Sequence, residues 1–208
     1  MKGFTYSGTH GNGEDVWRNY RESAFRFFQE CGLTVSSHFS DCSSISQISD
    51  PDFVFYYALA HGDYEYYICE PGASCTSNHI KDYLKDRGRM GFAFCGHCHS
   101  HVKTGSGTFS HCFRKGMTDG TITIGYHKAE QSEGWRFSLQ WQESLFSYLK
   151  DGMTFGEAFD EATADYPEIA EMVRFVGDTN LTLEQAKQRR EKEEEKKKCW
   201  LLELLHIQ

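Results

Sequence analysis

Two short apolar runs constrain the fold of this chain more than any other feature of its sequence. Residues 53–60 read Phe-Val-Phe-Tyr-Tyr-Ala-Leu-Ala, and residues 90–94 read Met-Gly-Phe-Ala-Phe. Both runs lack charged residues and are rich in aromatic ones, which is typical of strands buried on both faces of a sheet. Between them, residues 77–87 carry apolar side chains at helical spacing. This order of strand, helix and strand predicts a βαβ unit with a right-handed crossover.

The rest of the chain alternates between the same two patterns. Helical periodicity predicts helices over 14–31 and 134–150, and a Thr-x-x-Glu capping box at Thr154 predicts a third. Short β-branched or aromatic runs predict further strands, at 33–35, 64–69, 121–125 and 173–176. The serine-rich residues 36–49 are expected to form a surface connection. We therefore expect an α/β fold with a mostly parallel central sheet and helices on both faces.

Composition divides the chain into two parts. Residues 1–182 alternate as described above, whereas 183–208 hold a nearly uninterrupted run of charged and amide residues and then an apolar stretch. A run of charges is usually a solvated helix face. We therefore expect one α/β domain over 1–182 and a charged helical tail over 183–208. The apolar stretch makes self-association through this C-terminal helix a further expectation.

Charge and hydropathy exclude several classes of function. The formal net charge of −8 argues against nucleic acid as a partner, because phosphate binding needs a basic footprint. No stretch approaches the roughly 20 apolar residues that cross a bilayer, so no membrane partner is expected. The amino terminus does not resemble a signal peptide, which predicts a cytoplasmic location. In a reducing cytosol the eight cysteines are expected to be free thiols that are buried, bind metal or act as nucleophiles.

Reactive side chains follow the two buried strands directly. His61 comes after the first run, and Cys95 and Cys98 come after the second. In an open parallel sheet, ligands and chemistry collect beyond the carboxyl ends of the strands. A histidine and a thiol placed there are the parts of a Cys/His nucleophile pair. This pairing is the main reason to expect an enzyme.

The order of these motifs resembles that of the caspase-like cysteine peptidases, the clan that includes caspases, legumains and gingipains. A buried strand before the His-Gly motif at His61 and another before the Cys-x-Ser motif at Cys98 match the family pattern. The two residues are 37 positions apart in this chain, and caspases separate theirs by about 50. Residues 121–126 and 153–162 resemble the later strand and helix of bacterial and archaeal members, so the resemblance spans about 14–178. It implies the three-layer sandwich of that family.

The resemblance implies peptide hydrolysis, with Cys98 as nucleophile and His61 as its proton-handling partner. Only a few per cent of an ordinary thiol is thiolate at neutral pH, so a nearby imidazole raises that fraction or protonates the leaving amine. The backbone N–H groups of Gly62 and Cys98 would form an oxyanion hole. A peptide or protein substrate is implied, and no cofactor. The candidate substrate-binding residues are Asp63, Glu130 and Trp135.

The chain departs from the family pattern at three positions around the expected nucleophile. Gly96 replaces the usual acidic or amide residue, His97 replaces the usual small residue, and His101 stands where glycine is frequent. Because position 96 has no acid, that position gives no support to a preference for basic side chains. These departures bear on substrate preference more than on the reaction itself.

Three other interpretations remain open at the level of sequence. Cys95 is a rival nucleophile, although it continues the strand and its side chain is expected to point into the packed layers. His61 could be a structural loop histidine, and the chain an inactive caspase-like interaction module. A zinc site is the third, because five potential ligands lie close together in the sequence. Against it, no second half-site stands out elsewhere in the chain. These ligands are Cys95, His97, Cys98, His99 and His101.

Overall fold

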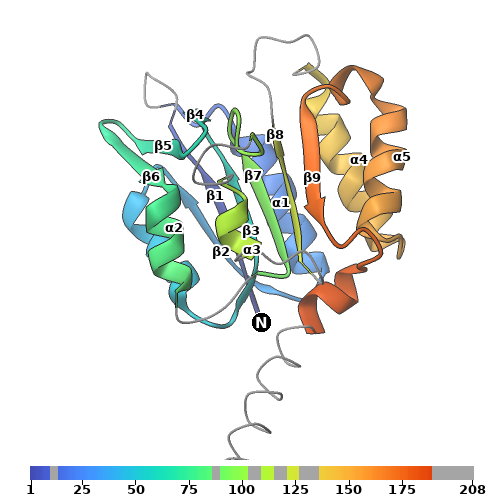
Figure 1. Ribbon diagram of the computed structural model, residues 1–208, viewed down its shortest axis with the longest axis horizontal. Coiled ribbons are helices and arrows are strands. Elements are labelled where there is room, and N and C mark those ends of the chain that lie inside the picture. The colour runs from blue at the N-terminus through green and yellow to red at the C-terminus, as the bar shows by residue number, and fades with distance from the viewer. Residues whose placement is uncertain (10–13, 86–89, 103–108, 115–120, 127–135, 189–208) are drawn as a thin grey trace, which may run out of the picture.

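The computed structural model describes residues 1–9, 14–85, 90–102, 109–114, 121–126 and 136–188 (Figure 1). Its central sheet has six strands in the order β2-β1-β3-β7-β8-β9. The strands are β1 (Lys2–Ser7), β2 (Thr34–Phe39), β3 (Phe53–Leu59), β7 (Phe92–Gly96), β8 (Ile122–Tyr126) and β9 (Val173–Gly177). Only β9 runs antiparallel to its neighbour within this sheet. The prediction of a mostly parallel central sheet is confirmed.

Helices cover both faces of this sheet. Successive residues of a strand point to opposite sides, so neighbouring residues of β3 contact different helices. Phe55 of β3 packs edge-on against Phe28 of α1, with ring centroids 5.5 Å apart. Its neighbour Tyr56 packs against Phe113 of α3 at 4.5 Å. In Figure 1, α1, α4 and α5 lie on one face, and α2 and α3 lie on the other. The helices are α1 (Arg18–Glu30), α2 (Ser77–Leu84), α3 (His111–Arg114), α4 (Ser138–Lys150) and α5 (Phe155–Asp165).

The uncharged runs form the centre of the molecule. Every residue of β3, β7 and β8 is buried, as expected for parallel strands covered on both faces. The capping box at the start of α5 is also confirmed. The Glu157 carboxylate accepts from the Thr154 N–H at 2.9 Å, and the Thr154 hydroxyl accepts from the Glu157 N–H at 3.3 Å.

A smaller antiparallel sheet leads from the end of β3 to α2. It consists of β4 (Gly62–Asp63), β5 (Tyr66–Glu70) and β6 (Ala73–Thr76), in that order. The sequence predicted one strand or hairpin arm at 64–69, and the structure adds a partner on each side of it. This small sheet fixes the segment that follows His61.

The expectation of a surface connection over 36–49 is wrong. The edge strand β2 continues to Phe39, and a 3₁₀ helix, η1 (Cys42–Ser49), follows it. Asp41 caps η1 by accepting from two backbone N–H groups. Two side chains of η1, Ile45 and Ile48, are buried. Two isoleucines among serines gave no helical period, because η1 is too short to show one.

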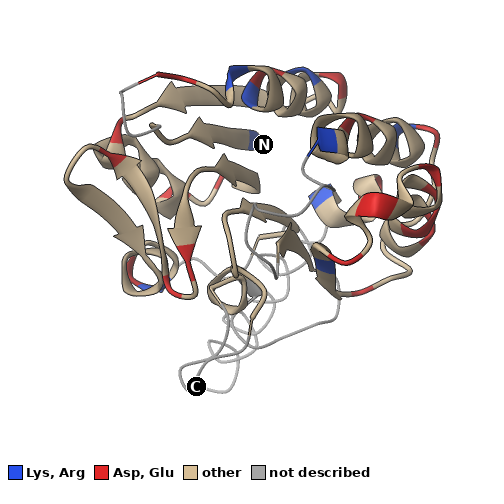
Figure 2. Ribbon diagram, turned by 90° about the horizontal axis from the view of Figure 1, so that it is seen from above, with Lys and Arg blue, Asp and Glu red and all other residues tan. Residues whose placement is uncertain are grey.

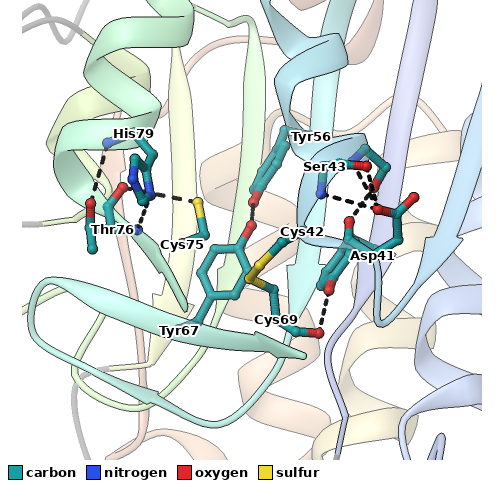
Figure 3. Close-up of a disulfide and its surroundings, with 11 residues drawn as sticks. Asp41, Cys42, Ser43, Tyr56, Tyr67, Cys69, Cys75, Thr76 and His79 are labelled. Atoms are coloured by element: carbon teal, nitrogen blue, oxygen red, sulfur yellow. Dashed lines mark hydrogen bonds between the residues drawn. A yellow bond between two sulfur atoms is a disulfide. The ribbon is translucent and has the colours of Figure 1, made fainter. Parts of the chain in front are cut away.

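A disulfide ties η1 to the small sheet, so the expectation that all cysteines are free thiols is wrong for one pair. Cys42 of η1 and Cys69 of β5 are joined, with Cα atoms 5.3 Å apart (Figure 3). The Tyr6 hydroxyl donates to the Cys69 carbonyl oxygen at 2.6 Å, which ties the same strand to β1. The other cysteines in the described chain carry free thiols: Cys31, Cys75, Cys95, Cys98 and Cys112.

The start of the expected tail lies against the domain. Residues 183–188 are helical, and Thr182 and Gln185 exchange hydrogen bonds at the start of that helix. The Lys187 ammonium donates to the Cys31 carbonyl oxygen at 2.8 Å. Residues 189–208, which include the segment expected to self-associate, lie outside the described residues. The division of the chain at 182/183 therefore stays a prediction.

The outer helices differ in the sign of the charges that they carry. In Figure 2, basic and acidic residues alternate along α1, whereas α5 carries acidic residues only. Among the described helices, none combines the length and the apolar character that a bilayer crossing requires.

Candidate functional site

The register of two neighbouring strands brings the expected catalytic loops side by side. Leu59 of β3 pairs with Gly96 of β7, and the Ala60 N–H donates to the Gly96 carbonyl oxygen at 3.3 Å. Paired strands lie about 4.8 Å apart. His61 and Cys98 each follow this pair by two residues. Both therefore lie at the carboxyl edge of the sheet, on adjacent loops.

The backbone at Gly62 is held by the small sheet. The His61 carbonyl oxygen accepts from the Ile68 N–H of β5 at 2.7 Å. In a trans peptide unit, the C=O of one residue and the N–H of the next point in opposite directions. The Gly62 N–H is therefore directed away from β5. A Cβ atom at position 62 would lie 2.9 Å from the Cβ atom of His97, so only glycine fits.

The imidazole of His61 is packed against an aromatic residue from the β1–α1 segment. The ring of Trp17 lies edge-on to it, with centroids 4.8 Å apart and planes at 81°. Trp17 is 4% exposed. Trp17 belongs to the helical pattern that predicted a helix over 14–31, and nothing in that pattern indicated a contact with His61.

An ion pair anchors the same segment to the end of β1. The carboxylate of Asp15 accepts from Arg21 at 2.7 Å and from the Ser7 hydroxyl at 2.8 Å. Both charged side chains are largely buried, at 9% and 12% exposure. Sequence analysis missed this pair, because charges six residues apart across a helix start do not stand out as partners. The pair fixes the segment that carries Trp17.

The two candidate thiols differ in exposure. Cys95 is fully buried within β7, paired on both sides by Ala58 and Gly125. Cys98 is partly exposed and lies in a turn closed by a hydrogen bond from the Ser100 N–H to the His97 carbonyl oxygen at 3.2 Å. Only the second thiol is placed where a substrate could reach it.

Ser100 of the Cys-x-Ser motif has a structural role. Its fully buried hydroxyl donates to the Cys95 carbonyl oxygen at 2.6 Å and accepts from the Tyr126 N–H at 3.2 Å. These bonds join the end of β7 to the end of β8. The serine thereby fixes the turn that carries Cys98.

His97 is a buried, neutral histidine. Its ring lies 4.5 Å from Phe109 and 5.5 Å from Tyr67, centroid to centroid. Burial, with smaller contributions from His101 and His99, lowers the pKa of His97 to about 3. The neighbouring departure from the family pattern also has a steric reason. A Cβ atom at position 96 would lie 2.7 Å from Leu59 Cδ1, so Gly96 leaves no room for an acidic side chain.

The five residues considered as zinc ligands point to different surroundings. Cys95 is buried within the sheet, and the His97 ring is buried against Phe109. The Nδ1 atom of His99 faces Asp63 Oδ1 at 3.0 Å, and His101 Nδ1 lies 3.2 Å from the Ser100 hydroxyl. Across the described ranges, no three His, Cys, Asp or Glu side chains are grouped so that they could hold a metal ion.

The structure describes only one of the three residues expected to bind substrate. Asp63 is 44% exposed, and its carboxylate contacts His99. Glu130 and Trp135 lie outside the described residues. Their assignment to substrate binding stays a prediction.

Comparisons with known proteins reveal relatives in structure only. No family model and no curated protein sequence matches the chain. The Arg-specific cysteine proteinase gingipain R (RgpB) superposes with a TM-score of 0.62 at 14% identity, over 86% of this chain and 46% of that chain. The complex of Porphyromonas gingivalis RgpB pro- and mature domains gives a TM-score of 0.61 at 14% identity, over 86% of this chain and 48% of that chain. Caspase-1 from Spodoptera frugiperda gives 0.54 at 12% identity, over 87% of both chains.

These likenesses concern the arrangement of strands and helices. The chain spans about half the length of the gingipain chains and most of the caspase chain. At identities of 12–14% the similarity shows the fold alone. The chain thus has the α/β fold, with a mostly parallel six-stranded sheet between two helix layers, that is found in the caspase-like cysteine peptidases.

Proposed function

We propose that the chain is a cysteine peptidase-like hydrolase that cleaves peptide bonds through Cys98 and His61. The observation that carries the proposal is the register of β3 and β7, which puts both residues two positions beyond the Leu59–Gly96 pair. The partly exposed thiol of Cys98 supports its role as nucleophile. The fold likeness to cysteine peptidases supports the same class of reaction.

The first half of the reaction forms a thioester. The Cys98 proton passes to the His61 imidazole, and the sulfur attacks the carbonyl carbon of the scissile bond. The Gly62 N–H, which is directed away from β5, and the Cys98 N–H donate to the developing oxyanion. His61 then gives its proton to the leaving amine as the C–N bond breaks. The acyl group remains bound to the Cys98 sulfur.

The second half releases the acyl group. Water attacks the thioester carbonyl carbon while His61 accepts a proton from the water, and the C–S bond breaks. The proton returns to the sulfur, so the enzyme is regenerated and a carboxylic acid leaves. The substrate is a peptide or a protein. The arginine specificity in the name of gingipain R belongs to that protein and is not extended to this chain.

The test compares two cysteines of β7 and its turn. Turnover of a fluorogenic peptide library and labelling by a peptidyl acyloxymethyl ketone are expected to be lost in Cys98→Ala and kept in Cys95→Ala. Loss in Cys95→Ala with full activity in Cys98→Ala would mean that the nucleophile is misassigned. A wild-type chain that turns over no peptide and takes no label would instead be an inactive interaction module.

A further inference from the structure

A contact between two side chains joins the candidate catalytic loops to each other. The Nδ1 atom of His99 lies 3.0 Å from the Oδ1 atom of Asp63. A carboxylate only accepts hydrogen bonds, so the histidine donates. His99 follows Cys98 directly, and Asp63 follows His61 by two residues. The contact therefore links the loop after β7 to the loop after β3.

Both partners of this contact are held in place by the β4–β5 turn. The ring of Tyr64 stacks on the ring of His99, with centroids 4.6 Å apart and planes at 8°. The Tyr64 N–H donates to the same Asp63 Oδ1 atom at 2.9 Å. Asp63 and Tyr64, which are consecutive residues, therefore both contact the imidazole of His99.

The backbone of His99 adopts a conformation that needs such support. Its φ is +59°, in the left-handed region that residues with a Cβ atom rarely adopt. A residue in such a region persists when its surroundings over-determine it, and such residues are enriched at functional sites. The hydrogen bond and the stacked ring supply the contacts that hold His99 there. The conformation of His99 in turn sets the direction of the turn at Cys98.

We propose that Asp63 and His99 form a latch whose role is to fix the Cys98 thiol relative to the His61 imidazole. Both are positioning residues, since neither is assigned contact with the reacting atoms. This inference rests on the proposed function and extends it. It also gives Asp63 a role other than the substrate recognition expected from the sequence.

The latch contributes little to the stability of the whole fold. The two side chains are 27% and 44% exposed, and exposed ion pairs add little to the free energy of folding. Removing the latch is therefore expected to leave the melting temperature nearly unchanged. Its effect falls on the placement of the two loops, and so on the catalytic step.

The test is a double-mutant cycle with Asp63→Ala, His99→Asn and the double variant. Asparagine tolerates a positive φ, so His99→Asn removes the ring without straining the turn. Each single variant is expected to lower kcat three- to tenfold with KM unchanged, and the double variant to match the singles. Asp63→Asn keeps an acceptor oxygen and is expected to retain most of kcat. Glu65→Ala removes an exposed carboxylate of the same turn and serves as the control.

Amide hydrogen exchange of the 97–102 turn gives a readout that does not require activity. Exchange is expected to accelerate about fivefold in each single variant and no further in the double variant. Unchanged exchange overturns the latch, whether or not the chain is a peptidase. Faster exchange with wild-type kcat, or multiplicative losses of kcat, overturns the positioning role. Faster exchange in a chain that never hydrolyses peptides refutes the proposed function and with it the positioning role, and leaves only the link between the loops.

Discussion

The Cys42–Cys69 disulfide allows a quantitative prediction about stability. The bond closes a loop with a sequence separation of 27. Chain-entropy theory gives about 3.6 kcal/mol of stabilisation at 25 °C for a loop of that length. In a protein of this size this corresponds to a melting temperature higher by about 7–14 °C. The double variant Cys42→Ala/Cys69→Ala is expected to lose that amount, because it removes the cross-link without leaving a lone thiol.

Urea unfolding followed by tryptophan fluorescence measures the loss. The matched control is Cys75→Ala in the neighbouring strand β6, which removes a buried thiol that forms no disulfide. It is expected to cost about 1 kcal/mol, as an average core substitution does. Reductant should lower the stability of the wild type toward that of the double variant and leave the double variant unchanged. The reasoning fails if the double variant is no less stable than Cys75→Ala, or if reductant has no effect on the wild type.

The same bond bears on the expected cytoplasmic location. Disulfides persist in oxidising compartments, and the cytosol keeps thiols reduced. Because Cys69 is fully buried in the fold, the thiols must be alkylated under denaturing conditions. A cytoplasmic location predicts that Cys42 and Cys69 are both alkylated when cells are lysed directly into denaturant that contains N-ethylmaleimide, and protection of both residues in that lysate would contradict the location.

Three further predictions concern the loops at the carboxyl edge of the sheet. Gly62→Ala is expected to lower the free energy of unfolding by about 1–3 kcal/mol and to remove most of kcat, because the new Cβ atom would lie 2.9 Å from His97 Cβ. Urea unfolding and peptide turnover measure the two effects, and wild-type values in both would refute the packing argument. Ser100→Ala is expected to cost about 1–3 kcal/mol by leaving buried backbone groups unpaired, and loss of kcat at unchanged stability would instead indicate a chemical role. His97 binds its proton only near pH 3 when folded, whereas the unfolded chain binds it near pH 6.5, so its contribution to stability is full above pH 6.5 and falls as the pH drops toward 3. Between pH 7 and pH 4.5 the loss amounts to roughly 2–3 kcal/mol, and the unfolding free energy of His97→Phe should lack that dependence.

The sequence indicated the central layer of this fold because its signal is local. An uncharged, aromatic-rich run as short as 53–60 favours a strand covered on both faces, and the βαβ pattern favours a parallel strand after the helix that follows. The Thr154 capping box was equally readable, since both of its bonds lie within four residues. The 3₁₀ helix η1 and the three-stranded small sheet were missed in part, because each is too short to establish a period.

Contacts between segments far apart in the chain were the ones that the sequence did not indicate. The Cys42–Cys69 bond depends on η1 lying against β5, and the contact between Trp17 and His61 depends on how the β1–α1 segment folds back. In both cases the residue types gave no sign of the partner, since buried cysteine and buried tryptophan are common in any core. Such pairs follow from topology, which has to be known first.

The candidate site shows how little of its chemistry resides in the reactive residues alone. Cys95 and Cys98 are the same residue type three positions apart, yet Cys95 is fully buried between two strands and Cys98 is partly exposed in a turn. The difference is produced by Ser100, which ends β7 by binding the backbone of β7 and β8, and by His99, whose left-handed backbone turns the chain. The residues around the thiol thus decide which cysteine can react. The same reasoning links Asp63, through its contact with His99, to the loop that carries Cys98.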